Sequence, residues 1–266
     1  MHICPLKHRA LIELTGEDRV AFLQGLVSAD IEKTAPFRAL YGAFLTPQGK
    51  FLYDFFVTAD GDRLLLEVEA ETRDEFRGKL SRFRLRSKVA LANVDDLQVY
   101  ALWGGDAVHF AEGIVVADPR LPQAGFRAWL PDPPPMPHSD WDAHRIPLGL
   151  PDGRRDMVPE KTILLEAGFD ELGGVDWQKG CFMGQEITAR SKYRGQIKRR
   201  LLPVDIEGDI PAPGTLIHAG SQEAGEMRSH AGQKGLAVIR LDCLNAELTA
   251  GATKLIPTPP PWINLA

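Results

Sequence analysis

The sequence contains few cysteines, and their placement excludes two common classes of site. Cys4, Cys181 and Cys243 are odd in number and far apart, and no Cys-x-x-Cys pair occurs. Neither a disulfide framework nor a cysteine zinc site is therefore predicted. Because the three cysteines are far apart, each would have to act alone, and a single cysteine cannot hold a stable iron–sulfur cluster without further ligands. We expect no resident metal.

Long apolar runs and an excess of positive charge are also lacking. No run approaches the roughly 18 apolar residues that a membrane helix needs, and Met1 to Arg9 includes no continuous apolar segment of the kind found in signal peptides. These features predict a cytoplasmic protein without a membrane partner. The net charge of −5 argues against nucleic-acid binding driven by bulk charge, although not against a local basic groove.

The composition is that of an ordinary globular protein. The chain has 266 residues, of which 44% are hydrophobic and 25% charged, enough for one large domain or two to three smaller ones. Residues 40–45 and 51–57 predict a β-hairpin, with Pro47 and Gly49 in its turn. Strand patterns outnumber helical ones and the hairpin is antiparallel, so the predicted fold class is α+β.

A few segments are expected to be helical. One helix is predicted from an N-cap at Thr15 to about residues 28–30, and a second after a capping box that begins at Thr72, with Phe76, Leu80 and Phe83 facing inward. Residues 141–145 and 164–172 also have helical patterns. The five prolines of residues 131–137 predict a rigid connector or a surface loop.

The pattern changes from residue 198 onward. Short apolar runs alternate there with Gly, Pro and Asn clusters, which is typical of a small β-barrel or sandwich. We place the boundary of this part near residue 196.

The stretch from Trp177 to Arg190 has the strongest functional pattern. We predict a strand into Trp177, a tight loop, and a short helix from about Gly184. Gly180 and Gly184 bracket Cys181 and allow unusual backbone dihedrals. Lys179 and the following helix N-terminus would both favour the Cys181 thiolate. A free cysteine is more often a small buried hydrophobe, but the flanking lysine and paired glycines favour a functional loop.

Two residues after the loop are expected to shape it. Gln185 and Glu186 can fix the loop by hydrogen bonds to its backbone, since buried N–H groups need partners. Glu186 and Arg190 are one helical turn apart and can pair on the helix surface.

The run Lys-Gly-Cys-Phe-Met-Gly-Gln-Glu at 179–186 resembles the hallmark of YgfZ-type folate-binding proteins, which are relatives of the glycine-cleavage T protein, an aminomethyltransferase. The residues around Phe22–Leu26, Leu45–Lys50 and Tyr193–Gly195 are also similar to that family. The resemblance implies a ring-like architecture around a folate cavity, with two ferredoxin-like α/β parts at 1–95 and 96–195 and a C-terminal β-barrel with a Pro-rich tail at 196–266.

The resemblance also implies a function. It indicates an accessory protein for the assembly or repair of iron–sulfur proteins that binds tetrahydrofolate or a one-carbon derivative of it. The protein would affect tRNA modification indirectly, with Cys181 and Lys179 at its reactive centre. Its partners would be folate and iron–sulfur client or assembly proteins. Two departures from the T protein matter: Pro147 stands where those relatives have a pterin-binding Glu, and Cys181 stands where they have an acidic or apolar residue.

Four residues are candidates for holding the folate. The Glu166 carboxylate could accept hydrogen bonds from pterin N–H groups, Trp141 could stack on the ring, and Arg145 and Arg190 could pair with a carboxylate. The ordinary alternatives are a surface Glu, a core Trp and solvated arginines.

Two other functions stay open from the sequence. One is a folate-dependent aminomethyltransferase or other one-carbon transferase. The other is a nucleic-acid or protein adaptor that uses a basic cluster, which we consider less favoured because of the acidic net charge. This cluster comprises Lys192, Arg194, Lys198, Arg199 and Arg200.

Overall fold

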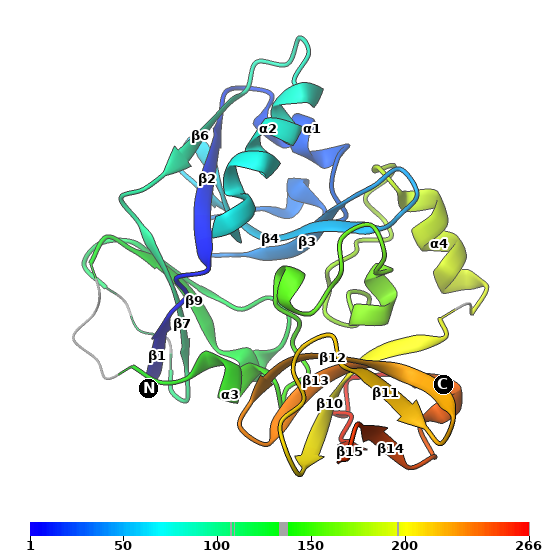
Figure 1. Ribbon diagram of the computed structural model, residues 1–266. Helices are drawn as coiled ribbons and strands as arrows, with labels where there is room; N and C mark the ends of the chain where they lie inside the picture. The colour runs from blue at the N-terminus through cyan, green and yellow to red at the C-terminus, as the bar shows by residue number, and fades with distance from the viewer. Residues whose placement is uncertain (107, 109, 133–137, 196, 266) are drawn as a thin grey trace. The chain divides into compact units, whose positions relative to one another are not determined.

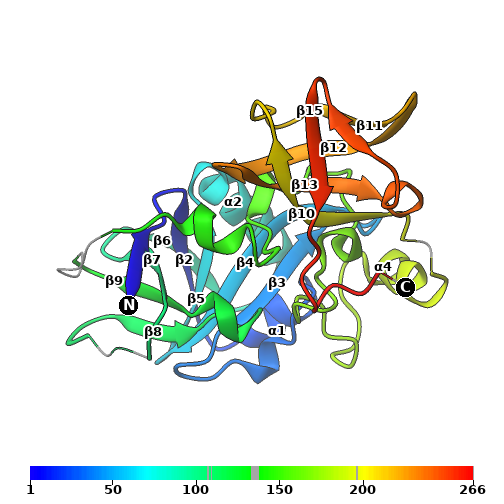
Figure 2. The same ribbon diagram turned by 90° about the horizontal axis from the view of Figure 1, so that it is seen from below.

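A computed structural model describes residues 1–106, 108, 110–132, 138–195 and 197–265 (Figures 1 and 2). The chain divides into two compact units, each built from separate segments. The first unit comprises Met1–Pro47, Leu52–Ser139 and Leu172–Gln185, and the second comprises Gln48–Phe51, Asp140–Glu171 and Glu186–Ala266. The loop that carries Cys181 therefore belongs to the first unit, although it is distant from most of that unit in sequence.

The first unit is built on a five-stranded sheet with the order β3-β4-β5-β2-β6. These strands are β2 (Arg9–Thr15), β3 (Leu40–Leu45), β4 (Phe51–Asp60), β5 (Arg63–Glu69) and β6 (Ala90–Val94). The short α1 (Arg19–Gln24) and the longer α2 (Arg73–Phe83) contribute apolar side chains to one core with this sheet. The predicted hairpin of β3 and β4 is confirmed.

A second sheet in the same unit has the order β1-β7-β9-β8. Its strands are β1 (His2–Pro5), β7 (Gln98–Trp103), β8 (Ile114–Ala117) and β9 (Phe126–Leu130). A buried ion pair links the two sheets: Glu67 of β5 pairs with Arg127 of β9, and Glu67 also accepts from Arg9 of β2, in its own sheet, at 3.0 Å. Such buried charges are tolerated because each has a partner of opposite sign.

The second unit contains a closed six-stranded barrel with the order β10-β13-β12-β11-β14-β15, drawn in yellow to red in Figures 1 and 2. The strands are β10 (Arg199–Glu207), β11 (Leu216–Ala219), β12 (Gln222–Ala231), β13 (Lys234–Arg240), β14 (Leu248–Ala250) and β15 (Thr253–Pro257). The predicted C-terminal barrel is confirmed. This unit also holds α3 (Trp141–Arg145), as predicted, and most of α4 (Gln185–Tyr193).

Several local predictions are wrong. The first helix begins after Asp18 rather than Thr15, since Gly16 has a φ of +103° that no helix accepts. It also ends at Gly25 instead of continuing to residues 28–30. Residues 170–180 form turns and bends, with no strand into Trp177, and the segment after Leu164 is only a 3₁₀ helix to Ala167.

The second helix differs from its prediction in detail. Thr72 is its N-cap, but its hydroxyl makes no hydrogen bond among the described residues, so the capping box does not form. Phe76 and Leu80 are buried as predicted, whereas Phe83 is 43% exposed. Most of the proline-rich connector, residues 133–137, lies outside the described residues. The mixed α+β class is confirmed, while the ring arrangement, the ferredoxin-like parts and the three domain boundaries stay predictions.

Candidate functional site

Cys181 is a free and exposed cysteine. It lies in an irregular loop before α4, bracketed by Gly180 with a φ of +89° and Gly184 with a φ of +82°. Both dihedrals fall in the left-handed region that strongly favours glycine. The two glycines are therefore needed for the backbone that presents the thiol to solvent. The other two cysteines are half-buried Cys4 and buried Cys243.

Lys179 anchors the loop to the segment that follows α1. Its Nζ donates to the carbonyl oxygens of Gln24 and Ala29, each at 2.7 Å, and also to the carbonyl of Val27. An ammonium group has three N–H donors, and three carbonyls here accept from it. Burial lowers the pKa of Lys179 to about 8 against the attraction of nearby carboxylates, Asp30 first. The Lys179 ammonium group therefore holds its own loop to the backbone of the segment that follows α1.

Gln24 completes this anchor from the other side. Its Nε2 donates to Asp30 Oδ1 at 2.8 Å and to the Lys179 carbonyl at 3.4 Å, and its Oε1 accepts from the Ile31 amide at 2.7 Å. Sequence reasoning assigned no role to Gln24 or Asp30. The sequence contained only a weak indication of this anchor, which was a polar Gln beside a Gly at the end of an amphipathic helix.

The approach to the loop is fixed by two further contacts. Asp176 accepts from the Gln178 amide at 2.8 Å and pairs with Lys33. Ser28, which is fully buried, donates from its hydroxyl to the Gly174 carbonyl at 2.6 Å. These contacts therefore join segments about 145 residues apart in sequence, just before the Cys181 loop.

The far end of the loop is closed at the start of α4. The Phe182 amide donates to Gln185 Oε1 at 3.1 Å, and the Gln185 amide donates back to the Phe182 carbonyl at 3.1 Å. Phe182 is buried, and Met183 packs against the core of the first unit. The Glu186 carboxylate is exposed and pairs with Arg190 at 3.4 Å, one turn along the helix.

The second unit holds a separate buried network around Arg145. The Arg145 guanidinium is 0% exposed and donates to Asp142 at 2.6 Å, Asp156 at 2.7 Å and Ser229 at 2.8 Å. Ser229 lies in β12, so the network joins the segment after α3 to the barrel. With its charge engaged inside the protein, Arg145 has no surface to offer a ligand in this conformation. Sequence reasoning missed Asp156, which is the buried partner.

The other predicted folate contacts differ in accessibility. Trp141 is only 3% exposed and packs with its ring centroid 5.6 Å from that of His144. Glu166 is half-buried, and burial raises the pKa of its carboxyl even though the Ile163 amide donates to it at 3.3 Å. Pro147 is exposed. Glu166 and Arg190 are thus the predicted contacts whose charged groups reach the surface.

The basic cluster at 192–200 is partly neutralised. Lys192 pairs with Asp170 at 2.9 Å, and the buried Arg200 pairs with Glu171 at 2.6 Å. Arg194, Lys198 and Arg199 remain exposed. Two of the five basic residues are therefore engaged in ion pairs, and the absence of direct nucleic-acid binding stays a prediction.

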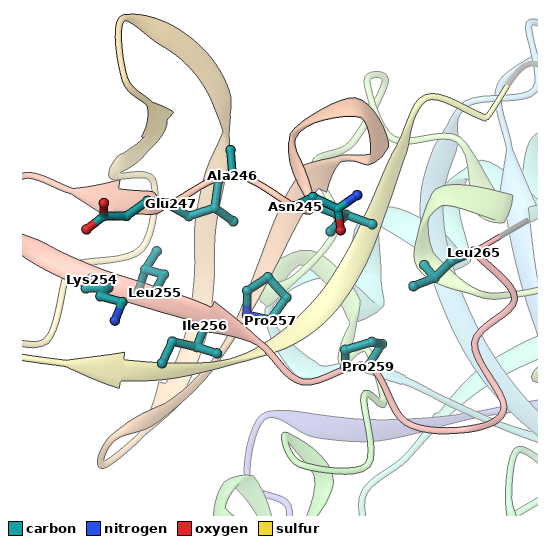
Figure 3. A pocket seen from close by; sticks show the side chains of 11 residues that line it. Asn245, Ala246, Glu247, Lys254, Leu255, Ile256, Pro257, Pro259 and Leu265 are labelled. Atoms are coloured by element: carbon teal, nitrogen blue, oxygen red, sulfur yellow. The ribbon is translucent and has the colours of Figure 1, made fainter.

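Two further observations bear on possible ligands. A groove of about 720 Å³ on the barrel lies between the β14–β15 hairpin and the C-terminal segment, lined by Glu247, Lys254, Pro259 and Leu265 among others, and contains none of the predicted site residues (Figure 3). Across the described ranges, no three His, Cys, Asp or Glu side chains converge as a metal-binding group, and no helix is long and apolar enough to cross a membrane.

Comparisons with known proteins identify the class. The fold matches the crystal structure of glycine cleavage system aminomethyltransferase T from Bartonella henselae with a TM-score of 0.76, over 98% of this chain and 86% of that chain, at 15% sequence identity. Residues 198–265 match the CAF17 C-terminal beta-barrel domain. The protein therefore has the aminomethyltransferase T fold, with a barrel of the CAF17 type.

The particular family follows from curated relatives. The chain is 30% identical to the iron-sulfur cluster assembly factor IBA57 homolog of Pyricularia oryzae over 96% of this chain and 78% of that protein. It is also 30% identical to the IBA57 proteins of Mus musculus, over 91% and 78%, and Homo sapiens, over 88% and 76%. The chain belongs to the IBA57 family of iron–sulfur cluster assembly factors, and the resemblance to the YgfZ-type proteins is confirmed. These relatives are named as mitochondrial, while a cytoplasmic location for this chain stays a prediction.

Proposed function

We propose that this protein assists iron–sulfur cluster assembly or repair through the Cys181 thiol and binds a tetrahydrofolate. The observation that carries the proposal is the presentation of Cys181: the thiol is exposed, while Lys179 holds its loop to three backbone carbonyls. A reactive group on an otherwise fixed loop is the arrangement expected of a functional thiol.

The chemistry assigned to Cys181 is transient ligation. A thiolate binds iron well, but one thiolate cannot hold a cluster alone. Cys181 would therefore share a cluster, as cargo, with ligands from a client or assembly protein. The effect on tRNA modification enzymes would follow indirectly from their clusters.

The folate part of the proposal rests on residues of the second unit. The half-buried carboxylate of Glu166 suits the N–H donors of a pterin, because charge-assisted hydrogen bonds favour its ionised form against the burial that raises its pKa. Arg190 on the exposed face of α4 suits the carboxylates of the glutamate tail. Trp141 and Arg145 are buried and would support this region through packing.

The alternative function is a folate-dependent aminomethyl or other one-carbon transferase. The T-protein fold favours it. Pro147, which has no side-chain acceptor where the T-protein relatives carry a pterin-binding Glu, argues against it. A turnover assay with an aminomethyl donor and tetrahydrofolate separates the two functions, because only the transferase would produce methylene-tetrahydrofolate.

Two measurements test the proposal. A strain that lacks the gene should lose activity of iron–sulfur enzymes and regain it when this chain is expressed; failure to regain it would contradict the assembly role. Isothermal titration of the purified protein with tetrahydrofolate should show binding that Glu166→Ala weakens about tenfold, as expected for the loss of one charge-assisted contact. An unaltered affinity would remove Glu166 from the site.

A further inference from the structure

A tight turn in the first unit carries an unusual residue. The Arg38 amide donates to the Ala35 carbonyl at 3.2 Å, which closes a turn with Pro36 at its second position and Phe37 at its third. Phe37 has a φ of +61° and is 71% exposed. A positive φ at the third position after proline normally selects glycine or asparagine. A bulky aromatic residue here has neither a relaxed backbone nor a buried side chain, which points to a functional constraint.

The base of this turn is fixed. The Thr58 hydroxyl of β4 lies 2.8 Å from the Arg38 carbonyl and 3.3 Å from the Ala35 carbonyl, and Thr58 is 0% exposed. Phe37 and Arg38 therefore project from a rigid support, and their side chains can meet a ligand with little loss of backbone entropy.

The two side chains border a cavity of about 440 Å³. Its walls are formed by Lys33, Phe37, Arg38, Tyr41, Pro119 and Asp176, all within the first unit. Asp176 is also the residue that supports the Gln178 amide before the Cys181 loop. The volume is sufficient for one substituted aromatic ring and its polar group.

The charge in this cavity is not balanced. Lys33 pairs with Asp176 and with Asp30 at 3.2 Å. Arg38 is exposed, and its guanidinium makes no ion pair within the described part of the chain. One positive charge is therefore available beside one exposed aromatic face. A planar guanidinium binds a carboxylate through two parallel hydrogen bonds, and Phe37 can stack against a ring in an offset arrangement.

We propose that this cavity is a binding site for a small aromatic carboxylate, with Phe37 stacking on the ring and Arg38 pairing with the carboxylate. The aminobenzoyl-glutamate end of a folate, which joins an aromatic ring to carboxylates, is one source of this chemistry if it binds here instead of at Arg190, and identifying it as the source rests on the proposed function. A free aromatic acid is the other source. The site involves no reaction and leaves Cys181 untouched.

Ligand-detected NMR and titration calorimetry on the full chain test the proposal. We use 4-aminobenzoate as the probe, 4-aminobenzamide as its neutral match, and 4-aminobenzoyl-glutamate as the folate fragment. Wild type should bind 4-aminobenzoate at least tenfold more tightly than the amide. Tighter binding of the folate fragment assigns folate as the source, and equal or weaker binding assigns a free aromatic acid.

Two variants and one control keep the result interpretable. Phe37→Gly and Arg38→Gln should each weaken 4-aminobenzoate binding at least tenfold. Phe37→Gly should not lower the unfolding midpoint, because glycine suits the turn better. Leu85→Gly is the matched control, since Leu85 is likewise exposed, at 90%, and has a positive φ of +44°, but lies outside this cavity. The affinity of this variant for 4-aminobenzoate should equal that of wild type.

The proposal is overturned if wild type binds none of the probes, if it binds the amide as tightly as the acid, or if both Phe37→Gly and Arg38→Gln bind as wild type does. Phe37→Gly retains the Cys181 loop. Its ability to rescue a strain that lacks the gene is therefore measured separately from the assembly role of Cys181.

Discussion

Lys179 and Gln24 hold each other by reciprocal hydrogen bonds between side chain and backbone. The Lys179 ammonium donates to the Gln24 carbonyl at 2.7 Å, and the Gln24 amide group donates to the Lys179 carbonyl at 3.4 Å. The pair joins the end of α1 to the loop that precedes α4, across 155 residues of sequence. The position of Cys181 therefore depends on a contact that neither segment can make alone.

Replacing the anchor lysine should loosen this loop. Lys179→Met removes the donor to three carbonyls, and we expect a loss of about 1–3 kcal/mol in the free energy of unfolding. Hydrogen exchange should increase at the amides of residues 178–183. Lys234→Met, which breaks an exposed pair with Asp205, is the control and should cost under about 1 kcal/mol. Unchanged exchange in Lys179→Met would show that the loop is held by other contacts.

The same lysine predicts a pH dependence of stability. Its pKa is lowered from 10.5 to about 8 in the folded protein, so the unfolded chain binds more protons between these values. Stability contributed by Lys179 should therefore rise with pH across this window. Denaturant unfolding at pH 7 and pH 9.5 measures the free energies of unfolding of wild type and Lys179→Met. The free energy of wild type minus that of the variant should be larger at pH 9.5 than at pH 7. A difference that shrinks would mean that the carbonyl hydrogen bonds keep the ammonium protonated.

Gly180 should be sensitive to substitution for a backbone reason alone. Its φ is +89°, and a Cβ added there would have no atom within 4 Å. Gly180→Ala should therefore cost about 1–2 kcal/mol through the left-handed conformation, without a steric clash. Thermal unfolding measures the loss. Gly25→Ala provides the contrast: it has the same open space, a φ of −77° and no expected loss.

Arg145 should prove structural. Arg145→Met removes a fully buried cation from Asp142, Asp156 and Ser229; Asp142 keeps its pair with Arg155, but the buried Asp156 carboxylate loses the Arg145 cation. We expect a loss of about 3–5 kcal/mol in stability, measured by denaturant unfolding. Arg240→Met, on an exposed pair with Asp242, is the control and should leave the stability nearly unchanged, because water screens this pair. A stable Arg145→Met variant that loses only folate affinity would return Arg145 to the binding site.

The sequence predicted some parts of this protein well for physical reasons. Alternating apolar residues and the Pro47–Gly49 turn are local signals, and they specify the hairpin of β3 and β4. The same holds for the barrel strands. The paired glycines around Cys181 indicated an unusual backbone, because few residues other than glycine adopt a positive φ.

The contacts that hold the site were not predictable in this way. Gln24 and Ser28 reach the Cys181 segment from about 145 to 155 residues away, and no local pattern encodes that distance. The burial of Arg145 was missed because its partner Asp156 and its contact Ser229 come from separate elements. The backbone strain at Phe37 is also visible only in three dimensions.

The most direct test concerns Cys181 itself. In a strain that lacks the gene, the activity of iron–sulfur enzymes is compared for wild type, Cys181→Ala and the control Cys4→Ala, which removes a half-buried thiol. With equal amounts of each protein, wild type and Cys4→Ala should restore activity, while Cys181→Ala should fold normally and restore at most about a tenth of it. Full restoration by Cys181→Ala would contradict the function assigned to this thiol.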